Sequence, residues 1–158
     1  MTTTNTTDTV NANVPAALNS RVIGVAHYAV RACLEGVLGR HGATFQQSVT
    51  LRVVVVAGGS LDRDALVRDV IGSLKVDESE VRGVIGELTA AGLLEEDPTE
   101  PSRLRPTDAG RELYEITTAE SAELSARLYA GIPAEDLAVA GRVLGLIRDR
   151  ANAELAAA

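Results

Sequence analysis

Apolar residues recur along the chain at intervals of three and four, the spacing that places them on one face of an α-helix. The pattern predicts helices over residues 14–41, 45–56, 62–74, 77–91 and 107–156, the last of them interrupted at residues 131–133. Residues 1–13 are polar and low in complexity, which predicts a disordered tail ahead of a single domain over residues 14–158.

The segment 45–56 is ambiguous in isolation, because its apolar run 53–56 also fits a buried strand. We interpret it as a helix, since Gln46, Gln47 and Arg52 do not alternate with the apolar positions. Thr44 precedes it and can cap its first turn.

The apolar stripes near the two ends of the chain are unusually wide. Residues 18–38 carry apolar side chains around much of the predicted helix, and residues 137–155 form a heptad-like stripe. We expect the terminal helices, about 14–41 and 107–156, to pack together and against a second copy. The sequence therefore predicts an obligate homodimer.

Residues 76–110 predict a helix, a stop, a short hairpin and a second helix start. Asp77 and Glu80 form a pair like a capping box, and Gly92 stands where helices end in a left-handed residue. Turn-forming residues 97–102 separate two short strands, and Thr107 can cap the following helix, with Gly110 in its first turn. The layout predicts a mainly α fold, a winged helix-turn-helix with a short β-hairpin wing. We call residues 44–110 the reader, because such units read DNA.

The charge of this region argues against ordinary DNA contact. Residues 77–100 contain eight acidic residues and one base, a balance of −7 that equals the net charge of the whole chain. The pI near 4.8 also argues against non-specific binding to nucleic acid or to anionic membranes.

Several residues of the reader could nevertheless touch DNA. Arg82, Gly83 and Gly86 face away from the apolar stripe of their helix, so Arg82 could read a guanine edge while the glycines allow close approach. The alternative is an ordinary solvated face. Ser79 is either a phosphate contact or a capping residue, and Lys75, just ahead of this helix, is a further candidate DNA contact.

Arg103 and Arg105 alternate around an apolar residue and so project from one side of the second wing strand. They either contact phosphate or the minor groove, or neutralise the acidic run 95–97 on the partner strand. Both interpretations stay open from the sequence.

A possible effector site lies on the first helix, where His27, Tyr28 and Arg31 are close in sequence. His27 and Arg31 share a face and could bind a carboxylate or a phenol in the dimer cleft, or serve as polar interface contacts. Cys33 lacks a neighbouring base, so we expect a buried, inert thiol.

Enzymatic and metal chemistry find no support in the sequence. Two distant histidines and one cysteine make no metal set, and Gly58-Gly59-Ser60 lacks the lysine of a phosphate loop. We expect no catalytic site, no metal and no cofactor. The N-terminus does not resemble a signal peptide, and no apolar run looks long enough to span a bilayer, so a cytoplasmic location is expected.

Three motifs, in this order and spacing, give the chain a resemblance to the MarR family of bacterial transcription regulators. Thr44-Phe45-Gln46-Gln47 resembles the family's T-x-x-Q helix start. Residues 81–94 resemble its recognition helix and exit, and residues 106–110 resemble the start of its long fifth helix.

The resemblance implies a dimer built from the first and the last two helices. It implies a recognition helix in each major groove, with a wing arginine in the minor groove. Many members release DNA when a small aromatic acid or phenol binds, or when a cysteine is oxidised. The expected function is therefore a DNA-binding, ligand-responsive repressor that acts as a homodimer on a pseudo-palindromic operator.

The chain departs from the family pattern in three places. Its wing is short and acidic, Arg82-Gly83 stands where Thr-Arg is frequent, and Pro106 replaces a leucine. The alternative function is therefore a MarR-fold sensor or protein-interaction module that has lost DNA binding because of its acidic recognition helix and wing.

Overall fold

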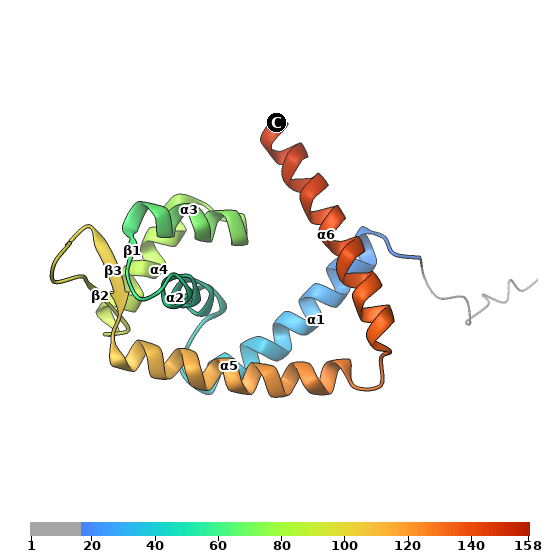
Figure 1. Cartoon of the computed structure of the whole chain (residues 1–158), viewed down its shortest axis with the longest axis horizontal. Coiled ribbons are helices and arrows are strands. Elements are labelled where there is room, and N and C mark those ends of the chain that lie inside the picture. The colour runs from blue at the N-terminus through green and yellow to red at the C-terminus, as the bar shows by residue number, and fades with distance from the viewer. Residues whose placement is uncertain (1–16) are drawn as a thin grey trace, which may run out of the picture.

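The computed structural model describes residues 17–158, and within them the chain is mainly helical (Figure 1). The elements in chain order are α1 (Ser20–Gly39), α2 (Phe45–Val56), β1 (Leu61–Asp62), α3 (Arg63–Leu74), α4 (Glu78–Ala90), β2 (Leu94–Glu96), β3 (Arg103–Pro106), α5 (Asp108–Tyr129) and α6 (Ala134–Ala157). The tail predicted over residues 1–13 lies outside the described residues.

The hydrophobic core lies in the reader, where α2, α3 and α4 pack against one another and against the wing. Its most buried members include Val54 from α2, Leu66 from α3, Ile85 from α4 and Leu104 from β3. Each such side chain stabilises the fold by about 1.5–3 kcal/mol relative to an exposed position. The apolar stripe predicted for α4 is buried along its whole length.

The ambiguous segment is a helix, and its start is held by a capping box. Thr44 Oγ1 accepts the backbone N–H of Gln47 at 3.2 Å, while Gln47 Oε1 accepts the N–H of Thr44 at 3.1 Å. Gln47 Nε2 also donates to Glu87 of α4 at 2.9 Å. The Gln47 side chain therefore caps the start of α2 and also links this helix to α4.

The wing is a three-stranded antiparallel sheet in the order β1-β3-β2, and not the two-stranded hairpin that the sequence predicts. Leu61 of β1 pairs with Leu104, and Glu95 of β2 pairs with Arg105. A strand of two residues is too short to show an alternating pattern, which is why β1 is invisible in the sequence.

Three residues that the sequence singles out lie at the ends of α4 and α5, the helices on either side of the wing. Gly92 has φ of +70° at the end of α4, as predicted. Asp77 lies at the start of α4, but its side chain makes no capping hydrogen bond, so the predicted capping box there is wrong. Thr107 caps α5 by accepting the N–H of Gly110 at 3.0 Å, and its hydroxyl donates to the carbonyl of Gly92 at 2.6 Å.

The first helix begins later than predicted. Asn19 caps α1 by accepting the N–H of Val22 at 3.1 Å, so the helix starts at Ser20 and not near residue 14. Only Val37 and Leu38 of α1 are buried, and the exposed residues include Cys33, which contradicts the expected buried thiol. Within residues 17–158, α1 is only partly covered ahead of Val37, and Cys33 lies on this part of the helix.

The last helix, α6, follows the end of α5 that is farthest from the wing, and it has no buried residue (Figure 1). Its exposed large apolar side chains are Val139, Val143, Leu144, Leu146, Ile147 and Leu155. Within residues 17–158, nothing buries the long apolar face of α6.

By length and composition alone, α1 could cross a membrane, with a mean hydropathy of 1.3 over 18 residues. The expectation that no stretch is long enough was therefore wrong on those two criteria. The helix also carries the ion pair Arg31–Glu35 at 2.9 Å, and its last turn is buried against the rest of the chain.

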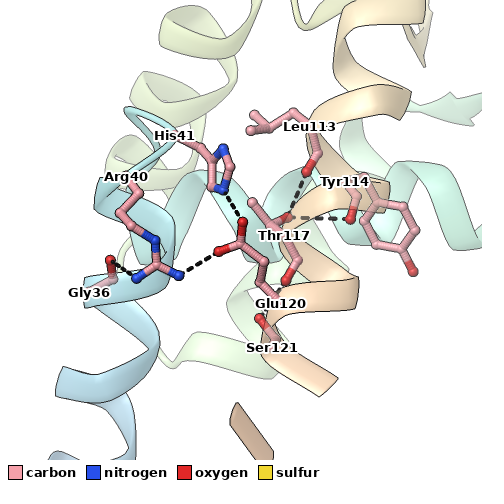
Figure 2. A network of polar contacts seen from close by, with 8 residues as sticks. All are labelled: Gly36, Arg40, His41, Leu113, Tyr114, Thr117, Glu120 and Ser121. Carbon is pink, nitrogen blue, oxygen red and sulfur yellow. Dashed lines mark hydrogen bonds and ion pairs between the residues drawn. The ribbon is translucent and has the colours of Figure 1, made fainter. Parts of the chain in front are cut away.

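A polar network joins the end of α1 to α5 (Figure 2). Arg40 Nη2 donates to one oxygen of Glu120 at 2.5 Å, and His41 Nε2 lies 2.9 Å from the other. The hydrogen bonds from Arg40, and then from His41, hold the pKa of Glu120 below its ordinary value. Two consecutive residues of the α1–α2 connection are thus fixed to the middle of α5.

Candidate nucleic-acid interface

The face of α4 that points away from the core carries only small, uncharged residues. Ser79, Gly83, Gly86 and Ala90 follow one another along this face, and all are exposed; we call them the outer stripe. A Cβ added at Gly83 or Gly86 would meet no atom within 4 Å. Packing within the chain therefore does not require either glycine, and the helix backbone is open to close approach.

Ser79 belongs to this stripe and is the second residue of α4, whereas Asp77 occupies the capping position. A capping role for Ser79 is therefore wrong. Its hydroxyl stands at the helix start, where backbone N–H groups and the helix dipole favour an anion. Contact between Ser79 and a DNA phosphate stays a prediction.

The charged residues of α4 lie on the two flanks of the outer stripe, where they bind residues of α2, of α3 or of α4 itself. On the α3 side, Arg82 Nε donates to Glu78 at 2.7 Å, and Nη2 donates to Asp64 at 3.1 Å. These hydrogen bonds, above all the one to Glu78, raise the pKa of Arg82. On the α2 side, Glu80 and Glu87 accept from Gln46 and Gln47.

The wing arginines also have partners within the chain. Arg105 donates to Glu95, its partner in the strand register, from Nε at 2.8 Å and from Nη2 at 2.7 Å. Arg103 instead donates to the carbonyl and the hydroxyl of Ser60, at 2.7 Å and 3.0 Å. The neutralising interpretation therefore fits Arg105, whereas Arg103 binds a residue that the sequence did not single out.

Asp97 shapes the tip of the wing. Its Oδ1 accepts from the hydroxyl of Thr99 at 2.6 Å, from the N–H of Thr99 at 2.9 Å and from the N–H of Glu100 at 3.3 Å. The hydrogen bonds from Thr99 hold the pKa of Asp97 far below its ordinary range. At least one of the wing's acids thus has a structural role in the turn.

Lys75 ends α3 in a left-handed conformation, with φ of +56°, and is exposed. Among residues 17–158 it takes part in no ion pair, unlike Arg82, Arg103 and Arg105. Of the predicted DNA contacts, Lys75 is therefore the cation that is free to meet a phosphate.

Two of the three predicted effector residues lie away from α4, beside a largely apolar cavity of about 470 Å³. His27 and Arg31 both line it, together with Leu34, Phe45, Tyr129 and Leu144. The Arg31 guanidinium lies over the Phe45 ring, 4.6 Å from its centroid. Tyr28 packs edge-on against His27 but is 70% exposed and does not line the cavity.

No protein-family model matches the sequence, and no curated protein matches it either. Solved structures do share its architecture. CouR from Rhodococcus jostii RHA1, bound to p-coumaroyl-CoA, has a TM-score of 0.69 at 20% identity, over 80% of this chain and 89% of that chain. A mutant MarR from E. coli, complexed with operator DNA, has a TM-score of 0.66 at 17% identity, over 80% and 91%.

A third similar structure is the PcaV transcriptional regulator from Streptomyces coelicolor in complex with its natural ligand. Its TM-score is 0.60 at 25% identity, over 86% of this chain and 99% of that chain. Other solved structures with similar scores are described as MarR-family transcriptional regulators, and not as enzymes. The helices α1–α6, the three-stranded wing and these likenesses together lead to one conclusion: the chain has the winged-helix fold of the MarR-type transcription regulators.

Proposed function

We propose that the chain is a DNA-binding transcription regulator, with α4 as its recognition helix. The observation that carries the proposal is the outer stripe, a row of small residues on an exposed helix beside a wing. A helix with such a face can enter the major groove closely, since no long side chain holds its backbone away from the bases. A neighbour of the same fold was solved with operator DNA.

The regulator acts as a homodimer. The exposed apolar faces of α1 and α6 support this proposal, because large contiguous apolar patches are rare on the surface of a monomer. A second copy placed on these faces would carry a second α4. Two-fold symmetry then predicts a pseudo-palindromic operator with half-sites about one helical turn apart.

A small aromatic acid is the proposed effector. Binding of this acid would cause the protein to release its operator, so the protein would be a cytoplasmic, ligand-responsive repressor. The cavity beside α1 supports this class, since its walls are apolar while His27 and Arg31 supply polar groups. Arg31 would meet the carboxylate by exchanging its present partner, Glu35. Two neighbours of the fold were solved with bound ligands.

Selection of bound fragments from genomic DNA tests the proposal. The expected result is a shared inverted repeat, protected from cleavage at two positions about 10 base pairs apart. Gly86→Leu should abolish protection, because it inserts a bulky side chain into the outer stripe. Gly72→Leu on α3 is the matched control, since Gly72 is also exposed, helical and free of neighbours within 4 Å. Fragments with no common sequence would contradict the proposal.

A second candidate is a protein-interaction module that does not bind DNA. The pairing of Arg82 and Arg105 with carboxylates favours it, because these side chains are occupied in the single chain. This function predicts co-purification of a basic protein and no recovered operator. Neutralising Glu95 and Glu96 to glutamine should then abolish that partner's binding.

A further inference from the structure

Arg82, the one base of the recognition helix, is held by two carboxylates that come from two helices. Glu78 lies one turn earlier on α4, and Asp64 lies in the first turn of α3. We call Asp64 and Glu78 the carboxylate clamp. The Arg82 side chain remains 45% exposed, so another anion can reach it.

Rigid elements place both carboxylates of the clamp. The backbone N–H of Asp64 donates to Asp62 Oδ1 at 3.0 Å, which fixes the start of α3. The buried face of α4 holds Glu78 and Arg82 at a spacing of four residues, where side chains meet on a helix. The contact between α3 and α4 is therefore set by the core, and not by a mobile loop.

The clamp occupies one edge of the Arg82 guanidinium that a nucleic acid could otherwise bind. Nε and Nη2 form one bidentate edge of a guanidinium, the type of edge that binds a phosphate or the O6 and N7 atoms of guanine. One positive charge between two negative charges also leaves this site with a net charge of −1. An approaching phosphate therefore meets repulsion until the carboxylates are displaced.

We propose that Asp64 and Glu78 compete with DNA for Arg82, so that the recognition helix binds only after Arg82 exchanges the clamp for the nucleic acid. This inference rests on the proposed DNA-binding function and makes Asp64, a residue of α3, a determinant of DNA affinity. The exchange leaves two carboxylates without their partner, which opposes binding.

Removal of the clamp should therefore strengthen binding. The variant Asp64→Asn/Glu78→Gln should bind an operator duplex about three- to tenfold more tightly, the range that exposed ion pairs support.

Charge-matched variants separate this effect from a change in net charge. Asp69→Asn and Glu80→Gln also remove one carboxylate from α3 and one from α4, but neither residue contacts Arg82. Fluorescence anisotropy on a fragment recovered by the genomic selection, or on a random duplex if none is recovered, measures affinity. Equal gains from both pairs of substitutions would overturn the inference, as would a gain that persists when Arg82→Ala is added to the clamp variant.

A measurement without DNA distinguishes failure of the inference from failure of the proposed function. The Arg82 Nε–H resonance, assigned by its loss in Arg82→Ala, should move in the clamp variant and stay in place in the control variant. A resonance that does not move overturns the inference, even where the unaltered chain binds DNA. A resonance that moves while no version of the chain binds any duplex overturns the proposed function and, with it, the competition.

Discussion

Gly110 of α5 lies directly against the carbonyl oxygen of Leu93, so close that an added Cβ would stand 2.1 Å from that oxygen. The same carbonyl accepts the backbone N–H of Thr107 at 3.1 Å. The wing base and the start of α5 therefore meet at a contact that only a glycine permits, because no side-chain atom fits in that space.

Substitution of Gly110 should weaken the fold. We expect Gly110→Ala to lower the free energy of unfolding by about 1–3 kcal/mol, the range of an overpacked contact that must shift backbone. Gly72→Ala on α3 is the control, and it should raise stability by up to about 1 kcal/mol, since its Cβ meets open space. Urea denaturation measures both, and equal midpoints for the two variants would contradict the prediction.

The link between α1 and α5 should make stability depend on pH at acidic values. Hydrogen bonds from Arg40 and His41 hold the pKa of Glu120 below its ordinary value of 4.5. The folded pKa lies below the unfolded one, so the contribution is complete above about pH 5 and is lost as pH falls through the folded pKa.

Glu120→Gln should therefore be less stable than the unaltered chain at neutral pH, and this difference should shrink below pH 4. Thermal melts from pH 3 to pH 7 give the comparison. Glu123→Gln, an exposed position on the same helix, serves as the control and should leave the acid dependence unchanged. A constant difference between Glu120→Gln and the unaltered chain at every pH would refute the role of Glu120.

The proposed effector cavity predicts that binding of aromatic carboxylates depends on Arg31. Isothermal titration with substituted benzoates and cinnamates should detect binding to the unaltered chain. Arg31→Gln should lose about tenfold or more in affinity, because a charge-assisted hydrogen bond contributes about 1.5–3 kcal/mol. Tyr28→Phe should change little, since Tyr28 lies outside the cavity. Equal losses in both variants would exclude the proposed orientation of the ligand.

A charge on the exposed face of α6 should disrupt assembly. Leu144→Asp is expected to unfold α6 or to cause aggregation, since it leaves the apolar face uncovered and places a carboxylate within it. Arg142→Glu, on the opposite side of the helix, should remain a dimer. Light scattering coupled to gel filtration separates the two results, and a stable, well-folded monomer of the unaltered chain at micromolar concentration would contradict the dimer.

Most of the fold was predictable, because its elements are long enough to show a period and carry clear end signals. The range of α2 was predicted correctly from Thr44 and the apolar spacing, and Gly92 correctly marked the end of α4. By contrast, β1 has two residues and no period. The Asp77 prediction failed because a residue of the right type at the right position need not turn its side chain toward the helix.

The candidate site was less predictable, since its partners are distant in sequence. Arg82 and Asp64 are 18 residues apart, and Arg103 and Ser60 are 43 apart. Only the pair Glu95–Arg105 followed from the strand pattern, because neighbouring strands bring such residues opposite each other. Which carboxylate binds which arginine depends on how α3 and the wing pack, and the spacing of residues along the sequence does not predict this packing.

The absence of buried residues from α6 has a consequence for how the protein folds. A helix of 24 residues without a buried residue gains little from its own backbone hydrogen bonds in water, since helices with little tertiary packing are marginally stable. We therefore expect α6 to gain order only as two copies associate, while the reader, which holds the core, folds by itself. The ordered length of the chain then depends on its concentration. In a dilute sample, a protease should remove α6 first and leave the reader intact.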